Sequence, residues 1–419
     1  MIQEQIHKKI LHNFDNIKSW FQEQKQGLNF PLYSSFDLRD SGFKVVPVDA
    51  NIFPAGFNNI CQTDKEHSVE LLGAFLSSHY EKNQNILLIT EEHTNNPYYW
   101  ENVYTIYEMI QATGRKVITA IPDESLKTPM DVESVNGHKL KVYPATKTSQ
   151  TIEVDGFTPD LIISNNDFSN SYQSWVEGLE TPMTPPHKLG WHVRRKESFF
   201  EQYNHVSKQF CELIDINPFH FNIPTEVHQS FDVTSKDSLQ TLAEHTDKFI
   251  NHLKSEYEKH DIKAEPFAFI KNNAGTYGMG VLTAKSGQDV LDWNNRARTK
   301  MKAAKGGRGV SEVILQEGIP SILKAEDTTA EPAIYMLGCE LAGGFLRTHH
   351  KKGPQENLNS PGAVFKRLCV ADLEINVEGL PMENVYGWVA KLGFLAIAKE
   401  AQAAKVEFKG YRPGENGPC

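Results

Sequence analysis

A lysine followed by a glycine-rich loop is the part of this sequence best suited to binding an anion. Residues 267–270 are apolar and predict a short buried strand that ends at Lys271, and Gly275, Gly278 and Gly280 follow. Glycines let the backbone approach a ligand and turn several N–H groups toward it, while the lysine adds a compact positive charge. We therefore expect a phosphate-binding loop here, with an ordinary glycine-rich turn as the alternative.

The elements around this loop support the phosphate interpretation. Residues 281–283 predict a second strand, residues 288–304 a helix, and residues 313–319 a further strand. This order resembles the nucleotide-binding subdomain of ATP-grasp enzymes, in which a lysine and a glycine flap hold the phosphates and the last strand ends in a hinge that contacts adenine. The resemblance implies that ATP is bound by Lys271, by the flap residues Gly275, Thr276, Tyr277, Gly278 and Gly280, and by the hinge residues Gln316, Glu317 and Ile319.

Two commoner nucleotide signatures are absent from the sequence. No G-x-x-x-x-G-K-[ST] motif occurs, and no G-x-G-x-x-G opens a helix after a first strand. The glycines at 278 and 280 lie between two expected strands instead. This placement favours a flap over a phosphate site capped by a helix.

Length and composition narrow the class of protein. The 419 residues predict about two or three domains, and 43 Lys and Arg against 53 Asp and Glu give a formal net charge of −10. This balance does not favour a nucleic-acid-binding protein, although it leaves room for a local basic pocket. Residues 2–21 have the spacing of an amphipathic helix rather than a signal peptide, and no run approaches the roughly 20 apolar residues of a membrane span. We expect a cytoplasmic protein that does not bind membranes.

The cysteines give no pattern. They are five in number, scattered and without C-x-x-C spacing, namely Cys61, Cys211, Cys339, Cys369 and Cys419. We therefore expect neither a disulfide framework nor a structural zinc site, and interpret each cysteine as a small buried residue or a free thiol.

The first part of the chain alternates strands and helices. Short apolar strands are expected at residues 44–48, 85–90, 116–120 and 160–164, helices at 68–80 and 100–113, and a hairpin at 139–144 and 151–154. This alternation predicts an open α/β sheet, in which ligands gather beyond the carboxyl ends of the strands.

Polar loops beside these strands supply candidates for binding an amino-acid substrate. Arg39 precedes the first expected strand, and its planar guanidinium could bind a carboxylate through two hydrogen bonds. A structural arginine between Asp37 and Asp40 is the alternative. Asp49 and Asn58 begin and end the polar loop after the first expected strand, and the exits at 91–97 and 165–167 are similarly polar.

The second part of the chain begins after a proline-rich stretch at 181–186, which predicts a linker. A helix is expected to open near residue 191 and run toward 214, followed by helices at 238–260 and 382–403 and a hairpin formed by 331–337 and 343–348. The loop 349–362 contains Glu356, Asn357 and Asn359, whose oxygen ligands suit the Mg²⁺ of a nucleotide triphosphate. An ordinary turn is the alternative for this loop.

Most of the chain resembles the proteobacterial type of glutamate–cysteine ligase, a family of ATP-grasp ligases. The resemblance rests on residues 35–59 (SFDLRDSGFKVVPVDANIFPAGFNN), 189–200 (LGWHVRRKESFF), 269–281 (FIKNNAGTYGMGV), 315–319 (LQEGI), 331–337 (EPAIYML) and 356–363 (ENLNSPGA). It implies an α/β protein with an N-terminal open sheet followed by an ATP-grasp domain. The expected division is a substrate domain at 1–180, a helical part at 187–265, a nucleotide lid at 266–320 and a C-terminal subdomain at 321–419.

The resemblance also implies roles for further residues. Lys196 matches an earlier phosphate lysine of related enzymes, with a solvated helix charge as the alternative. Arg347 resembles the arginine that meets the transferred phosphate and the acyl oxygens, so that Arg347 and Lys271 are the expected catalytic residues. The family's usual magnesium pattern, a carboxylate followed two residues later by Asn on a late strand, fits Glu374-Ile-Asn376, but we prefer Glu356, Asn357 and Asn359 as ligands.

The implied reaction is the first step of glutathione biosynthesis. Mg-ATP phosphorylates the γ-carboxylate of glutamate, and the α-amine of cysteine then displaces the phosphate. The expected partners are therefore glutamate, cysteine and ATP, and homo-oligomerisation stays open. Another ATP-grasp carboxylate–amine ligase, or a non-catalytic nucleotide-binding protein, is the alternative.

Overall fold

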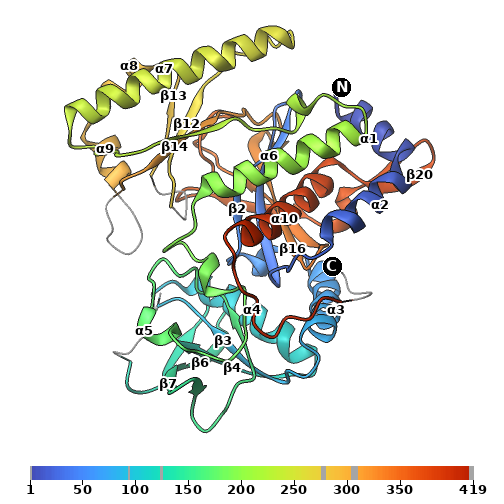
Figure 1. Cartoon of the computed structure of the whole chain (residues 1–419), viewed down its shortest axis with the longest axis vertical. Coiled ribbons are helices and arrows are strands. Elements are labelled where there is room, and N and C mark those ends of the chain that lie inside the picture. Colours follow the sequence, from blue (N-terminus) through green and yellow to red (C-terminus); the bar gives the residue numbers. More distant parts are fainter. Residues whose placement is uncertain (1, 93–94, 123–125, 275–279, 303–309, 415–419) are drawn as a thin grey trace.

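The computed structural model of this chain describes residues 2–92, 95–122, 126–274, 280–302 and 310–414. Within these residues the fold is mixed α/β, as predicted, and it is built around three large sheets (Figure 1). None of the helices in the described residues combines the length and the apolar character that a membrane span needs.

The central sheet is antiparallel and joins the two ends of the chain. Its strand order is β18-β17-β16-β1-β2, and the short β15 pairs with β16. The bounds are β1 (Tyr33–Asp40), β2 (Val45–Asn51), β15 (Lys324–Ala325), β16 (Thr328–Leu337), β17 (Glu340–Thr348) and β18 (Val364–Leu368). The helices α6 (Lys196–Leu213) and α10 (Val385–Ala403) pack together, and both contact β2. The sheet therefore unites segments that are far apart in the sequence.

Successive side chains of β1 point alternately to the two faces of the central sheet. Phe36 and Leu38 join the core that contains α10, where the ring of Phe36 lies against Gly393. Since successive side chains of a strand point to opposite faces, Asp37 and Arg39 project from the other face. All four side chains are buried, which is the setting in which charged residues need partners.

The sequence prediction was wrong about the start of this sheet. No strand was expected at residues 33–40, because β1 carries Ser35, Asp37, Arg39 and Asp40 where an apolar run was sought. The strand expected at 44–48 exists as β2, but it pairs with β1 and not with the N-terminal α/β sheet. Residues 33–51 thus share a sheet with the C-terminal strands, while the four-part division of the chain stays a prediction.

The second sheet is the expected open α/β sheet. Its order is β10-β9-β3-β4-β6-β5, with parallel pairing except at β5. The bounds are β3 (Asn85–Ile89), β4 (Lys116–Ile121), β5 (Met130–Glu133), β6 (Lys139–Pro144), β9 (Leu161–Ser164) and β10 (Met183–Thr184), with helices α3 (Gln62–His79), α4 (Pro97–Ala112) and α5 (Gln173–Val176).

Two local predictions in this region were wrong. Strand β6 pairs with β5, whereas β8 (Thr151–Glu153) pairs with β7 (Thr146–Thr148), so the expected hairpin does not form. The proline-rich stretch at 181–186 is not only a linker, because it contributes the edge strand β10, whose two residues are buried.

The third sheet forms a separate lobe with α7, seen at the top of Figure 1. It is antiparallel with the order β11-β14-β12-β13. The bounds are β11 (Thr225–His228), β12 (Ala268–Asn272), β13 (Val281–Ala284), β14 (Val313–Glu317), α7 (Lys236–Lys259), α8 (Gly287–Leu291) and α9 (Asn295–Lys302). The helix expected at 288–304 is therefore two helices, and an apolar core of its own fills this lobe.

The remaining elements cover the core around α10. The N-terminal segment forms α1 (Ile2–His12) and α2 (Phe14–Lys25), and the hairpin of β19 (Glu374–Val377) and β20 (Leu380–Glu383) lies near α1 and α10. The expectation of unlinked cysteines was wrong for Cys61 and Cys369, which a disulfide joins, and for Cys339, which is also disulfide-bonded. Cys211 is a free, buried thiol, as expected.

Candidate functional site

A charged hollow lies where the central sheet meets the lobe of β12. Its described lining comes from β1, β2, β12, β13, β16, the start of α6 and the loop 349–362. We call this place the charged hollow, and its charged and amide side chains are Asp37, Arg39, Asp49, Lys196, Lys271, Asn272, Glu331, Asn357 and Asn359. Several residues predicted from the sequence to bind ATP, magnesium or substrate are therefore close together.

Two lysines from different elements meet at Asp49. Lys196 is the first residue of α6, and its Nζ donates to Oδ1 of Asp49 on β2. Lys271, near the end of β12, donates from Nζ to Oε1 of Gln316 at 2.6 Å and to the carbonyl of Val48 at 2.8 Å. Lys196 is only 6% exposed, so it is not the solvated helix charge that was the alternative.

Burial strongly affects the charges of this group. It lowers the pKa of Lys271 to about 7, against the opposing effect of Asp49, and nearby Lys196 lowers it further. Burial alone would raise the pKa of Asp49, but Lys196 and Lys271 beside it hold that pKa below its usual range. Lys271 therefore loses its proton more readily than an ordinary lysine, and a bound anion would favour its charged form.

Arg347 sits between two carboxylates on the face of the central sheet. Its Nη1 donates to Oδ2 of Asp37 at 2.7 Å and to Oε1 of Glu331 at 2.8 Å, and its Nη2 donates to Oδ1 of Asp37 at 3.1 Å. Burial alone would lower the pKa of Arg347, but Asp37 and Glu331 raise it above its ordinary value. Burial would likewise raise the pKa of Glu331, whereas Arg39 and Arg347 hold it below the usual range.

Asp37 and Glu331 were missed as site residues. The signal for Glu331 was present in the sequence, because the hairpin predicted at 331–348 places Glu331 opposite Arg347 in the observed register. The signal for Asp37 was its spacing of two from Arg39, which puts both side chains on one face of a strand.

The guanidinium of Arg39 donates hydrogen bonds to other parts of the protein. Its Nε donates to Oε2 of Glu331 at 2.7 Å. Its Nη1 donates to the carbonyls of Pro354 at 2.8 Å and Ile319 at 3.3 Å, and its Nη2 to the carbonyl of Glu356 at 2.6 Å. The guanidinium therefore ties β1 to the hinge and to the loop 349–362, and its partner is Glu331 rather than a flanking aspartate.

The three expected magnesium ligands do not point to one place. Asn357 and Asn359 line the hollow, but the carboxylate of Glu356 accepts from Lys352 at 2.9 Å and from the backbone N–H of Gly353 at 2.8 Å. The alternative pair, Glu374 and Asn376, lies on β19 and does not line the hollow. The described lining residues with carboxylate or amide oxygens are Asp37, Asp49, Asn272, Glu331, Asn357 and Asn359, a set that fits Mg²⁺.

The three expected hinge residues have different hydrogen-bond partners. Gln316 reaches Lys271, as given above, and the carbonyl of Ile319 accepts from Arg39. The carboxylate of Glu317, one of the expected hinge residues, is fully buried and accepts from Lys44 at 2.6 Å. Burial lowers the pKa of Lys44, and Glu317 opposes this effect.

The other predicted site residues are not brought into the lining. Asn58 lies in the 3₁₀ turn Phe57–Asn59 and donates to Asn59 at 3.2 Å. Gly280 has a φ of 63° and accepts from the N–H of Asn272 at 3.2 Å, so it needs the freedom of glycine. Four expected flap residues lie outside the described part of the chain, namely Gly275, Thr276, Tyr277 and Gly278.

Comparison with known proteins gives a consistent result. A family model described as glutamate-cysteine ligase matches residues 7–401. The crystal structure titled "Putative gamma-glutamylcysteine synthetase" from Methylobacillus flagellatus KT is 33% identical, covers 96% of both chains and superposes with a TM-score of 0.83. No curated protein matches the chain.

Two more distant solved structures are also similar to this chain. D-alanyl-alanine synthetase A from Vibrio cholerae O1 biovar eltor is 14% identical over 77% of this chain and 80% of its own, with a TM-score of 0.35. A glutathione synthetase-like effector from Globodera pallida is 10% identical over 87% and 86%, with a TM-score of 0.40. At these scores neither structure adds to the assignment.

Proposed function

Since the chain belongs to the glutamate–cysteine ligase family, we propose that the charged hollow is the active site in which it joins glutamate to cysteine. The protein is accordingly a ligase. The observation that carries the site assignment is that Lys196, Lys271 and Arg347 come from three different elements and meet at one hollow. There Lys196 pairs with Asp49, Arg347 pairs with Asp37, and Lys271 donates to Gln316. These are the three cations that the family resemblance pointed to.

ATP and Mg²⁺ are the proposed companions of this reaction. Lys196 and Lys271 would hold the phosphates, and Asn357 and Asn359 with Asp37 or Glu331 would hold the metal. When bound, Mg-ATP supplies the phosphoryl group that turns the γ-carboxylate of glutamate into a reactive acyl phosphate. The lysines fit this role because an anion would take the place of Asp49 as their counter-charge.

The chain's own groups contribute positioning and charge rather than a nucleophile. Asp49 keeps Lys196 in the hollow, and Gln316 keeps Lys271 there. Arg347 is fixed by Asp37 and Glu331, so that its positive charge is held beside the lining of the hollow. Preorganised cations of this kind stabilise charge on oxygens as bonds change, without the cost of reorganising in the transition state.

Arg39 acts through other residues in this proposal. Its hydrogen bonds to the carbonyls of Pro354 and Glu356 hold the loop that carries Asn357 and Asn359. We therefore replace the substrate-carboxylate role expected of Arg39 with a positioning role. Asp49 lines the hollow and keeps its proposed place in the site. Asn58 is not among the described lining residues, so its expected role has no support from this hollow.

Phosphate release tests the substrate assignment. The enzyme, ATP and Mg²⁺ are supplied with glutamate plus cysteine, with glutamate plus alanine, and with γ-glutamylcysteine plus glycine. We expect rapid release that depends on both glutamate and cysteine. Release with γ-glutamylcysteine plus glycine alone would assign a different ligase reaction, and no release with any pair would contradict the proposal. Location in the cytoplasm stays a prediction from the sequence, and the oligomeric state stays open.

A further inference from the structure

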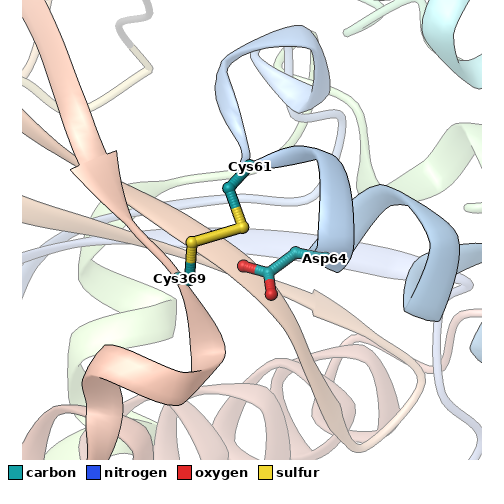
Figure 2. Close-up of side chains that lie close together, drawn as sticks. All are labelled: Cys61, Asp64 and Cys369. Carbon is teal, nitrogen blue, oxygen red and sulfur yellow. A yellow bond between two sulfur atoms is a disulfide. The ribbon is translucent and has the colours of Figure 1, made fainter.

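A second chemically reactive cluster lies outside the lining of the charged hollow. Its three members are Cys61, Asp64 and Cys369, whose sulfur and carboxylate atoms all lie within 4.8 Å of one another. Figure 2 shows the sulfur atoms of Cys61 and Cys369 bonded, with the carboxylate of Asp64 pointing toward them. Cys61 immediately precedes α3, Asp64 lies in the first turn of α3, and Cys369 follows β18.

The two sulfurs are in unequal surroundings. Cys61 is half-buried, whereas Cys369 is only 2% exposed. The Nε of Arg367 donates to Sγ of Cys369 at 2.9 Å. A cation beside a sulfur stabilises its thiolate, so Cys369 is the better leaving group and Cys61 is the sulfur that a molecule from solvent can reach.

Asp64 is held in place beside this pair. Its Oδ2 accepts from the backbone N–H of Val370 at 3.0 Å, and its side chain belongs to a buried residue of α3. Burial raises the pKa of this carboxyl, which makes it a better proton acceptor than an exposed aspartate. A proton acceptor next to a buried thiol can take the proton of that thiol and so promote formation of the thiolate.

A metal site is the competing interpretation of the same residues. Two thiolates and a carboxylate are ligands that Zn²⁺ accepts. The guanidinium of Arg367 at the sulfur of Cys369 opposes a bound cation but favours a thiolate, and the sulfurs are joined to each other. The charge arrangement therefore favours sulfur exchange over metal binding.

We propose that Cys61 and Cys369 form a redox-active pair that exchanges with small thiols and disulfides. A thiolate RS⁻ attacks Sγ of Cys61, forms a mixed disulfide and releases Cys369 as a thiolate beside Arg367. A second thiolate attacks the outer sulfur of the mixed disulfide, and RSSR and the Cys61 thiolate leave. Two protons complete the balance, so that the protein disulfide and two RSH give two protein thiols and RSSR.

The reverse direction uses RSSR as the oxidant and gives Asp64 its role. The Cys61 thiolate attacks RSSR and releases RS⁻. Asp64 takes the proton from Cys369, whose thiolate then attacks the mixed disulfide at Cys61 and releases the second RS⁻. Ring closure cross-links residues that are 308 positions apart.

The cross-link fastens the edge of the sheet that carries the proposed active site. Cys369 ends the segment that begins with β18, and β18 pairs with β17, the strand of Arg347. The loop 349–362, with Asn357 and Asn359, connects these two strands. The exchange chemistry itself depends only on the sulfur pair, Asp64 and Arg367, and would hold whichever amine the ligase accepts.

The test uses the full-length protein in buffers with different ratios of reduced to oxidised glutathione. After acid quenching and alkylation, peptide mass spectrometry measures the fraction of Cys61 linked to Cys369. We expect this fraction to follow the buffer ratio reversibly. A fraction that stays fully linked or fully unlinked at every ratio would overturn the proposal.

Single-cysteine variants test the asymmetry. In Cys369→Ser, oxidised glutathione should form a mixed disulfide at Cys61, and in Cys61→Ser the buried Cys369 should react at least about tenfold more slowly. Equal labelling would contradict the assigned order of attack. Cys211→Ala is the matched control and should change nothing, because burial raises the pKa of the Cys211 thiol to about 12.

Two variants distinguish a role of Asp64 and Arg367 in thiol–disulfide exchange from a purely structural role. Asp64→Asn should slow ring closure, and Arg367→Gln should slow opening, each by roughly tenfold, as expected for a lost charge-assisted contact. A structural role would shift the melting temperature and leave both exchange rates unchanged, which would contradict the proposal. Stoichiometric binding of Zn²⁺ by the reduced protein, with loss of exchange, would assign the metal site instead.

Discussion

Two polar regions of the molecule were expected to bind ligands, and they differ in what their side chains contact. At the strand ends of the parallel sheet, amides serve the local backbone. Nδ2 of Asn165 donates to the carbonyl of Pro54 at 2.8 Å, and Nδ2 of Asn166 donates to the carbonyl of Thr90 at 3.0 Å. Oε1 of Glu91 accepts from the backbone N–H of Asp167 at 2.8 Å. These groups hold loops in place.

In the charged hollow, by contrast, full charges face full charges. Lys196 pairs with Asp49, and Arg347 pairs with Asp37 and Glu331. A ligand that carries phosphate and carboxylate oxygens can take the place of such partners, whereas it cannot replace a loop's own backbone. The density of polar residues at a strand end is therefore a weaker sign of a site than buried, paired charges.

The largest effect that tests this contrast is expected at Arg347. Arg347→Met leaves Asp37 and Glu331 buried without their shared cation, which should lower the free energy of unfolding by about 3–5 kcal/mol and abolish turnover. Urea denaturation measures the first effect. The double variant Arg347→Met, Asp37→Asn should recover part of the stability, because one of the buried negative charges is gone. If the single variant were as stable as the parent protein, the paired charges of the hollow would not have the importance assigned to them.

Lys271→Ala should lower kcat/KM for ATP by about 10²–10³-fold while the protein stays folded. The reason is the loss of a cation held in the hollow by Gln316 and Val48. Steady-state phosphate release gives the rate, and circular dichroism checks the fold. Lys366→Ala is the matched control, since this lysine only forms a partly exposed pair with Glu326. Equal rates for both variants would remove Lys271 from the site.

Arg39→Lys tests the positioning role of Arg39, because a lysine cannot donate to all four oxygens that Arg39 contacts. If Arg39 positions Asn357 and Asn359, the Mg²⁺ concentration for half-maximal rate should rise roughly tenfold, with a smaller change in kcat. A magnesium titration at saturating ATP measures this shift. If only the KM for glutamate rose, the original substrate-carboxylate role would be restored.

The smallest effect on rate is expected in the parallel sheet. Asn165→Ala removes hydrogen bonds to Pro54 and Asn102 and should lower the free energy of unfolding by about 1–3 kcal/mol. The kcat/KM of the folded enzyme should stay within about twofold of the parent value, a figure on the scale of a surface substitution. A loss of a hundredfold with full stability would make this region part of the site.

Elements with a clear local apolar pattern were predicted correctly from the sequence. The apolar run expected at 85–90 is β3, Asn85–Ile89, and the expected hairpin of 331–348 is β16 with β17. Strand β1 could not be found in this way, because its charged residues are buried only by virtue of partners such as Glu331 and Arg347, which lie about three hundred residues away. Local apolar patterns carry no information on such pairing.

The residues of the candidate site also divide into those that could be predicted from the sequence and those that could not. Lys271 was predicted from its place before a glycine-rich loop and Lys196 from the family resemblance, and the structure brings both into the lining. Asp37 and Glu331 were missed although the spacing of Asp37 from Arg39 and the predicted hairpin of Glu331 were visible, because neither pattern shows which cation lies opposite until the strand register is known. The Cys61–Cys369 disulfide was missed for a similar reason, since neither cysteine lies in a spaced motif and only the packing of α3 near β17 and the end of β18 brings them together.

The most direct measurement is a crystal structure of the protein with Mg²⁺ and a non-hydrolysable ATP analogue. We predict that the phosphates contact Nζ of Lys196 and Lys271, that Lys196 leaves Asp49, and that the metal lies among Asn357, Asn359 and the carboxylates of the hollow. A nucleotide bound elsewhere, with the Lys196–Asp49 pair and the contact between Lys271 and Gln316 intact, would contradict the assignment of this hollow as the active site.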